Sequence, residues 1–366
     1  MFTRLQLNGY RGFESYGIND LARVNLLVGK NNSGKTSVLE AINLLTDSSS
    51  LRALARFATQ RRQQKYWFFE DQRDQRNVEI LDVSPVFFGH RMKPNTQFTV
   101  ASNRNELSME TVAINRMEND KYYSDPEIQE VARKIGETAF MGLKITGNWL
   151  NLVHPVFLVT ESGSLIYSNQ LRQYTQWETE YRSRFLSTIP MSPFDIRNIW
   201  EKVIRERRET YLADALRTLE PDIDLIHLLP GNWSVDNVLV DRKSGGPRIG
   251  IGSFGEGMRR LLDLALALID SANGVLLIDE IDTGLHWTVM EDLWRFVINA
   301  ARRSNVQVFA TTHSYDCLKG LASVLENDVD LASDVSLQKI ERALPQAVSL
   351  PGEKIPVAIE REIEVR

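Results

Sequence analysis

A glycine-rich run near the start of the chain has residue types and a spacing that bind phosphate. Residues 29–36 read Gly-Lys-Asn-Asn-Ser-Gly-Lys-Thr and fit the pattern G-x-x-x-x-G-K-S/T. Glycine lets the backbone wrap closely around an anion, so amide N–H groups and a helix N-terminus point at phosphate oxygens. Lys35 would reach the β- and γ-phosphates of ATP, and the Thr36 hydroxyl would bind Mg²⁺. The alternative is an ordinary glycine-rich turn. The residues expected to hold the nucleotide are Gly29, Asn31, Asn32, Ser33, Gly34, Lys35, Thr36 and Ser37.

Two acids directly follow an apolar run in the second half of the chain. Residues 275–278 read Val-Leu-Leu-Ile, typical of a buried strand, and Asp279 and Glu280 come next. Ligands of a parallel sheet bind at the edge where its strands end. Asp279 would hold Mg²⁺ through its water shell, and Glu280 would orient the attacking water and accept its proton. A strand followed by solvated acids is the alternative.

Further polar residues follow the next predicted strand and the acids. His313 comes after residues 306–310 and Thr311-Thr312, so it is expected at the same sheet edge, where it could contact the γ-phosphate. A structural histidine is the alternative. Asp282 could cap the helix that follows it, or it could lie in an interface.

The spacing of apolar residues predicts elements that would position these side chains. The expected strands are 2–7, 24–28, 86–88, 98–101, 156–160, 275–278 and 306–310. The expected helices are 38–45, 126–141, 169–186, 196–219, 258–269 and one between the last two strands. The phosphate run therefore lies between a strand and a helix, as its pattern requires. The strands near both ends, each followed by a helix, predict one α/β core interrupted by a middle segment.

With these motifs in this order, the chain resembles the ABC-type ATPases. Ser253-Phe254-Gly255-Glu256-Gly257, before an apolar helix, looks like the signature motif of that family. In the family, the signature of one subunit caps the γ-phosphate held by the phosphate loop of another. The resemblance thus implies a head-to-tail homodimer around ATP, with Ser253, Gly255, Glu256 and Gly257 touching the partner's nucleotide. A helix cap with glycines for a tight turn is the alternative.

Within that superfamily, residues 5–13 (Leu-Gln-Leu-Asn-Gly-Tyr-Arg-Gly-Phe) and the run 29–37 are similar to the SMC/RecF branch. The whole chain resembles the ATPase part of OLD-family proteins, and residues 309–314 strengthen the likeness. The resemblance implies that Asp282 belongs to the D-loop between the two sites and that Arg11 lies near the base or ribose. For the glutamine that senses magnesium in this family, Gln60, Gln72 and Gln75 are equal candidates.

The implied fold is an α/β P-loop ABC-type ATPase head, with a mixed or parallel sheet flanked by helices, an antiparallel sub-sheet and a helical insertion. The N-terminal half of the head is expected over residues 1–116 and an inserted helical arm with some strands over 117–224. The C-terminal half, with the signature, the two acids and His313, is expected over 225–366.

One departure from the OLD family bears on chemistry. OLD nucleases continue after the ATPase into a Toprim domain, whereas only about fifty residues follow His313 here. Asp328 and Asp330 lack a surrounding βα core and are expected in an exposed loop. We therefore expect no nuclease activity in this chain.

Composition limits the remaining classes of function. The 366 residues have a net charge of −5, one cysteine and no apolar run long enough for a membrane span, which favours a cytoplasmic protein without disulfides. The negative charge argues against coating of duplex DNA, although the basic stretch between Arg52 and Arg76, or the charged helix near Arg205, could bind DNA or be a solvated surface.

The leading hypothesis is an ATPase switch that dimerises around ATP and controls a separate DNA-acting effector, such as a Toprim-type nuclease, in genome maintenance or phage defence. One alternative is the nucleotide-binding subunit of a membrane transporter, against which the long separation of phosphate loop and signature argues. Another is a nucleotide-gated scaffold that hydrolyses negligible ATP, against which Glu280 argues, since such a scaffold needs no base there.

Overall fold

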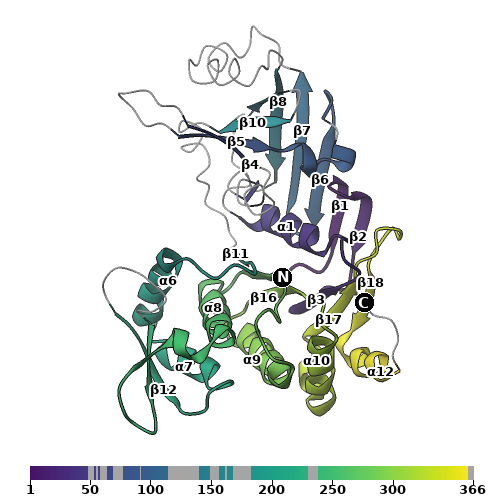
Figure 1. Ribbon diagram of the computed structural model, residues 1–366. Coiled ribbons are helices and arrows are strands. Elements are labelled where there is room, and N and C mark those ends of the chain that lie inside the picture. Colours follow the sequence, from purple (N-terminus) through teal and green to yellow (C-terminus); the bar gives the residue numbers. More distant parts are fainter. Residues whose placement is uncertain are drawn as a thin grey trace.

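The computed structural model describes residues 1–47, 53–54, 57, 64–68, 77–90, 92–113, 140–148, 156–160, 163–167, 183–229 and 238–361. These residues form two large sheets stacked with helix α1 (Lys35–Thr46) between them, and a layer of helices covers the far face of the lower sheet (Figure 1). The apolar side chains gather into two cores, one on each face of the lower sheet.

The lower sheet carries the phosphate loop. Its strand order is β11-β15-β16-β3-β17-β18, and all neighbours pair in parallel except β17 and β18. Its strands are β11 (Ser183–Leu186), β15 (Val275–Ile278), β16 (Gln307–Thr311), β3 (Val24–Val28), β17 (Val335–Lys339) and β18 (Val348–Pro351). Parallel pairing brings the ends of β3, β15 and β16 to one edge, so that the residues following them are neighbours.

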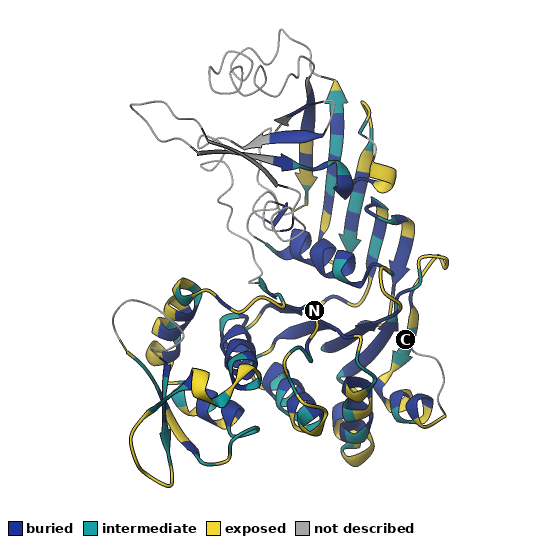
Figure 2. Ribbon diagram, viewed as in Figure 1, coloured by how far each residue is buried: buried dark blue, intermediate teal, exposed yellow. Residues whose placement is uncertain are grey.

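The central strands are apolar on both faces, as a sheet covered on both sides requires. All residues of β3 are buried. Val24, Leu26 and Val28 pack into the core on the helical side, whereas Leu27 packs into the core shared with α1 and the upper sheet. Figure 2 shows the same burial along the strands of this layer.

The upper sheet is antiparallel and has the order β2-β1-β6-β7-β8-β9-β10-β5-β4. Its strands are β1 (Leu5–Tyr10), β2 (Phe13–Ile18), β4 (Gln64–Phe68), β5 (Asn77–Asp82), β6 (Gln97–Ser102), β7 (Glu106–Ala113), β8 (Phe140–Gly147), β9 (Val156–Thr160) and β10 (Ser164–Tyr167). One face of this sheet covers α1, whose Val38, Leu39 and Ile42 are fully buried.

Helices cover the other face of the lower sheet (Figure 1). They are α6 (Pro193–Arg205), α7 (Glu209–Leu216), α8 (Glu256–Asp270), α9 (Met290–Arg303), α10 (Tyr315–Asn327), α11 (Val329–Ala332) and α12 (Ile355–Glu360). Ser192 caps α6 by accepting the Asp195 N–H, and Ser314 caps α10 by accepting the Cys317 N–H. A small antiparallel sheet, β12 (Ile223–Leu228), β13 (Val238–Arg242) and β14 (Ile249–Gly250), leads into α8. Within the described residues, none of these helices has the length and apolar content to cross a membrane.

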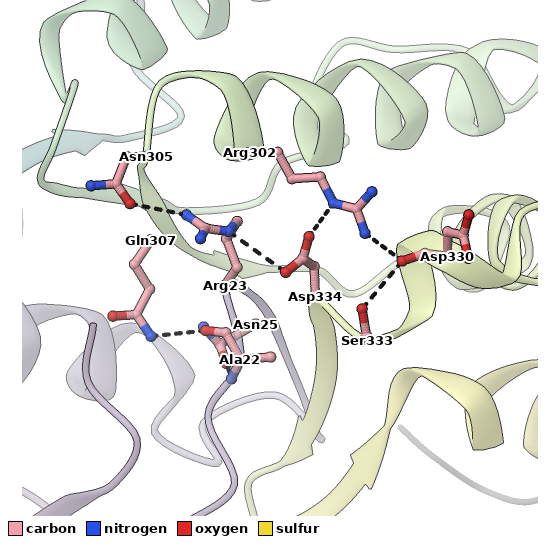
Figure 3. A network of polar contacts seen from close by, with 9 residues as sticks. All are labelled: Ala22, Arg23, Asn25, Arg302, Asn305, Gln307, Asp330, Ser333 and Asp334. Carbon is pink, nitrogen blue, oxygen red and sulfur yellow. Dashed lines mark hydrogen bonds and ion pairs between the residues drawn. The ribbon is translucent and has the colours of Figure 1, made fainter.

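A polar network closes the edge of the lower sheet where its strands begin (Figure 3). Gln307, at the start of β16, donates to the carbonyl oxygens of Phe2 and Ala22 at 2.8 Å each. Asn25 likewise bonds the backbone of Ala22 through both its side-chain atoms. Further out, Asp334 forms ion pairs with Arg23 and Arg302. These bonds therefore hold the turn before β3 to the start of β16 and to the residue before β17.

The expected α/β head with a mixed sheet and an antiparallel sub-sheet is confirmed. The predicted strand 86–88 is wrong: residues 84–86 form a 3₁₀ turn with Pro85 at its start, because the proline ring favours a turn there. The end of the predicted helix 169–186 is also wrong, since residues 183–186 form edge strand β11. Helix 196–219 is two helices broken at Arg207, which has a positive φ of 54°.

Two other expectations concern the middle of the chain. Most of the predicted helix 126–141 lies outside the described residues, and residues 140 and 141 begin β8. The expected boundary at residue 117 falls between β7 and β8, which are hydrogen-bonded neighbours in the upper sheet. The described part of the expected arm, 117–224, thus supplies strands to both large sheets as well as α6 and α7.

Candidate nucleotide site

The phosphate loop joins the end of β3 to the start of α1. Its backbone takes left-handed conformations at Gly29 (φ 141°), Asn32 (φ 62°) and Gly34 (φ 105°). Two of these positions have no room for a side chain. An added Cβ at Gly29 would lie 2.5 Å from the Ile340 carbonyl oxygen, and one at Gly34 would lie 2.5 Å from the Phe13 ring. The loop therefore has the tight, helix-capping shape that presents amide N–H groups to an anion.

Lys35 lies beneath this loop and is buried. Its Nζ donates to the carbonyl oxygens of Gly29, at 2.7 Å, and Lys30, at 3.0 Å. Burial lowers the pKa of Lys35 to about 8, while the carboxylates of Asp279 and Glu280 act in the opposite direction. The folding of the loop thus places a partly desolvated cation where phosphate would bind.

The two expected Mg²⁺ ligands meet at this sheet edge. Asp279 follows β15, and its Oδ1 accepts hydrogen bonds from Thr36 Oγ1 at 3.2 Å and from Thr311 Oγ1 at 2.8 Å. A hydroxyl at the first turn of α1 and a carboxylate at the end of β15 are hard oxygen donors of the kind Mg²⁺ prefers. Their direct contact brings together the two residues that are expected to hold Mg²⁺.

Glu280 has a strained backbone. Its φ is 49°, in the left-handed region that costs a residue with a Cβ roughly 1 kcal/mol or more. Its N–H donates to Thr311 Oγ1 at 2.8 Å, and its exposed carboxylate accepts a weak bond from Thr283 Oγ1 at 3.4 Å. The buried hydroxyl of Thr311 therefore serves both acids, donating to Asp279 and accepting from the Glu280 backbone.

His313 and Asp282 lie on the same side of the molecule. His313 is exposed just after β16 and helps to line a cavity of about 280 Å³ together with Lys30, Asn31 and Thr312. The Thr312 hydroxyl donates to Asp282 Oδ1 at 2.6 Å and accepts the Ser314 N–H at 3.0 Å. The turn after β15 and the turn after β16 are thus tied together beside the phosphate loop.

The signature-like residues lie where α8 begins, next to the turn that contains Asp282. Ser253 belongs to a short 3₁₀ helix (Ile251–Phe254), Gly255 caps α8, and Glu256 begins it. Ser253, Gly255 and Glu256 are exposed. A Cβ on Gly257 would lie 3.1 Å from the Gly284 carbonyl oxygen, so the start of α8 packs closely on the turn that contains Asp282.

Arg11 forms a buried ion pair with helix α1. Its guanidinium is buried and pairs with the buried carboxylate of Glu40 in α1 at 2.7 Å. Its expected role near the base or ribose stays a prediction. The three glutamines considered as magnesium sensors, Gln60, Gln72 and Gln75, lie outside the described residues.

Two arginines at the site were missed by the sequence patterns. Arg342 lies over the Phe13 ring and donates to the Ser33 carbonyl oxygen at 3.2 Å, which supports the phosphate loop from the segment after β17. No motif signals this contact, because the two residues are 309 positions apart. Arg260 is buried on α8 and bonds the backbone that follows β15. The sequence offered one signal for Arg260, namely a charged residue among the apolar residues of a predicted helix.

The strand order and the loop before α1 are those of a P-loop ATPase head. Residues 1–140 match the family "AAA ATPase domain", and residues 162–316 match "AAA domain, putative AbiEii toxin, Type IV TA system". A protein of Helicobacter pylori (strain ATCC 700392 / 26695) named "ATP/GTP phosphatase" is 21% identical over 362 residues, covering 92% of this chain and 91% of that protein. A "DNA replication and repair protein RecF" of Cellvibrio japonicus is 50% identical over 51 residues, 14% of each chain.

Solved SMC head domains are also similar to this chain. The head bound to the C-winged helix domain of ScpA has a TM-score of 0.49 and 15% identity, covering 96% of this chain and 98% of that one. The head from Thermotoga maritima has a TM-score of 0.43 and 13% identity, with coverage of 96% and 98%. Because both TM-scores are below 0.5, we assign the fold from the strand order given above. The motifs and the sequence matches make this chain similar to SMC/RecF-like ATPases of the ABC type.

Proposed function

We propose that this protein is an ATP-dependent switch, in which two copies close around two ATP–Mg²⁺ molecules, hydrolyse them and reopen. Each site would use the phosphate loop, Asp279 and Glu280 of one copy and the signature turn at Ser253 of the other. ATP and Mg²⁺ are the proposed ligands, with Thr36 and Asp279 holding the metal.

The contact of Asp279 with Thr36 is the observation that carries the chemical part. It joins the start of α1 to the turn after β15 that carries Glu280, so Thr36 and Asp279 would hold a metal ion, which would supply Lewis-acid chemistry next to the proposed general base. The His313 side chain at the neighbouring cavity would face the γ-phosphate from the third strand end. One chain thus supplies a cradle, a metal site and a base.

The exposed signature turn supports the two-copy arrangement. Ser253 and the free N–H groups at the start of α8 make an anion-binding end of a helix that is open to solvent. A second copy turned head to tail would bring the γ-phosphate on its own loop to this end. The Asp282 turn, packed under Gly257, would lie in the same interface.

Complementation tests this arrangement directly. Lys35→Ala removes the phosphate loop's cation and Ser253→Arg blocks the signature, so each variant alone is expected to release little phosphate. Mixing them restores one composite site, and we expect up to about a quarter of the wild-type rate at equal concentrations, because random pairing makes half of the dimers mixed and each mixed dimer has one working site of two. Mixed variants that stay as inactive as each alone would contradict the sandwich.

The second part of the proposal concerns what the closed dimer acts on. The RecF-named relatives act in DNA replication and repair by their names. We propose that the closed dimer controls a separate DNA-acting effector, such as a Toprim-type nuclease, and that this chain has an OLD-like ATPase role without nuclease activity of its own. Asp328 and Asp330 flank the start of the short helix α11, and no cluster of metal-binding side chains occurs among the described residues.

DNA cleavage and partner recovery test the output. Purified protein with Mg²⁺ or Mn²⁺ should leave DNA intact. Cleavage that persists in Lys35→Ala would contradict the proposal, because it would place nuclease chemistry in this chain outside the ATP site. Recovery of the Glu280→Gln protein from its native cell with ATP should bring down a stoichiometric partner, and recovery with neither partner nor DNA would count against a switch.

A further inference from the structure

A buried arginine joins helix α8, which follows the signature turn, to the backbone of the two acids after β15. Arg260 lies one turn into α8, which packs against β11 (Figure 1). Only 7% of the residue is exposed. Its Nη1 donates to the Ser187 carbonyl oxygen at 2.6 Å, and its Nη2 donates to the carbonyl oxygens of Asp279 at 2.9 Å and Glu280 at 3.0 Å.

These three acceptors come from the ends of two neighbouring strands. Ser187 follows β11, and Asp279 and Glu280 follow β15, which pairs with β11 in parallel. The planar guanidinium has five N–H donors in fixed directions, so it holds several carbonyl groups in one geometry more firmly than a flexible ammonium does. Arg260 therefore fixes the backbone at the sheet edge where the site lies.

The electrostatic surroundings support a fixed charge at this position. Burial lowers the pKa of Arg260, and the carboxylates of Asp263, Asp279, Asp282 and Glu280 oppose that effect. Asp263, one turn further along α8, is itself buried and accepts the Met191 N–H at 3.1 Å. Burying two charged side chains in α8 costs desolvation energy, which points to a purpose beyond packing.

The strained conformation of Glu280 supplies that purpose. A non-glycine residue with a φ of 49° keeps this conformation only when surrounding bonds determine it. The Glu280 peptide is held from one side by Thr311 through its N–H and from the other by Arg260 through its carbonyl oxygen. Movement of α8 would act on the second of these bonds.

We propose that Arg260 is a positioning residue for Glu280, and that it couples the signature turn of each chain to the general base of the same chain. In the sandwich, the signature turn contacts the partner's nucleotide while Glu280 serves the chain's own nucleotide. Arg260 therefore links the two sites through one helix. This inference rests on the proposed two-copy function.

Single variants separate positioning from stability. Arg260→Gln keeps a polar side chain but loses the planar guanidinium donors and the charge. Arg260→Lys keeps the charge with one donor group. We expect kcat to fall at least about tenfold in Arg260→Gln, with partial recovery in Arg260→Lys, while the KM for ATP changes less than about twofold. The matched control is Lys202→Gln, because Lys202 donates to the Ile269 and Asp270 carbonyl oxygens at the other end of α8. This control should lower the melting temperature without lowering kcat.

The mixed dimer gives the decisive measurement. In the pair of Ser253→Arg and Lys35→Ala chains, the Ser253→Arg chain supplies the working phosphate loop and Glu280, and the other supplies only the signature. Arg260→Gln in the Ser253→Arg chain should lower the restored rate about tenfold, whereas in the Lys35→Ala chain it should lower it far less. Equal losses from both chains would make Arg260 a general packing residue of α8 and overturn the inference. If the parent pair restores no activity, the proposed function has failed before Arg260 is tested.

Discussion

The two edges of the lower sheet are built in opposite ways. At the edge where the strands begin, Gln307 and Asn25 bond the backbone of Ala22 and Asp334 pairs with two arginines, in a network that needs no ligand (Figure 3). At the edge where they end, Glu280 is strained and Lys35 is desolvated. The first edge has groups suited to holding strands in register, and the second has groups whose charges would be better satisfied by a bound polyanion and a metal.

Groups suited to stability and groups suited to function therefore lie at opposite ends of the same strands. Residues at the first edge should matter to folding and little to hydrolysis. Residues at the second should matter to hydrolysis, because strain and burial there are kept for a ligand rather than relieved. Substitutions at either edge test this separation.

The largest effect is expected at Glu280. Glu280→Gln removes the proposed general base and should lower phosphate release by about 10²- to 10⁴-fold, while ATP still binds through the phosphate loop. The carboxylate is exposed, so the melting temperature should stay within the range of surface substitutions. Single-turnover phosphate release and a thermal melt check both parts. A variant with near wild-type turnover would remove Glu280 from catalysis.

A smaller but substantial effect is expected at Thr311. Thr311→Val keeps the shape but removes the hydroxyl that donates to Asp279 and accepts from the Glu280 N–H. Leaving these groups unpaired costs roughly 1–3 kcal/mol, and we expect a fall in kcat of about tenfold or more. Ser336→Ala is the control, since Ser336 is buried and donates to Asn25 at the opposite edge. If Ser336→Ala lowered kcat as much, the separation of the two edges would not hold.

Nucleotide affinity should depend on pH through Lys35. Burial lowers the pKa of Lys35 to about 8, so without nucleotide the side chain is charged below that pH and loses its proton above it. Phosphate favours the charged form, and binding above pH 8 must therefore take up a proton. We expect the ATP dissociation constant to be flat below about pH 7.5 and to rise by up to about tenfold per unit above 8. Calorimetry in buffers of different ionisation enthalpy measures the proton, and a flat affinity from pH 7 to 9 would contradict this role.

The smallest effect on turnover is expected at the opposite edge. Gln307→Leu removes the amide that bonds Phe2 and Ala22, so it should lower the free energy of unfolding by about 1–3 kcal/mol and leave kcat nearly unchanged. Denaturant unfolding and steady-state phosphate release measure the two quantities. A large loss of kcat with little loss of stability would reverse the comparison.

The sequence allowed the central strands and the phosphate loop to be predicted, because their signals are local. Continuous apolar runs such as 275–278 specify buried strands, and the glycine and lysine spacing at 29–36 specifies the loop. Long-range pairing was not predictable. Strand β5 pairs with β10 across more than eighty residues, and β11 joins the lower sheet although its residues were predicted as helix.

The same distinction applies to the site. Asp279, Glu280 and Thr36 have spacings that predict their chemistry, and the structure brings Thr36 and Asp279 into contact. The supports of the site come from distant residues, such as Arg342 on Ser33, and the environment of Arg11 depends on Glu40, which no motif names. Roles that rest on a partner chain, as for Ser253 and Asp282, stay predictions.

The most direct test of the two-copy switch is the size of the particle in solution. Light scattering of Glu280→Gln, with and without ATP and Mg²⁺, should show a monomer that becomes a lasting dimer only with nucleotide, while the wild type dimerises briefly and releases phosphate. A Glu280→Gln protein that binds ATP, as shown by calorimetry, and keeps the same mass with and without it would contradict closure of two copies around nucleotide.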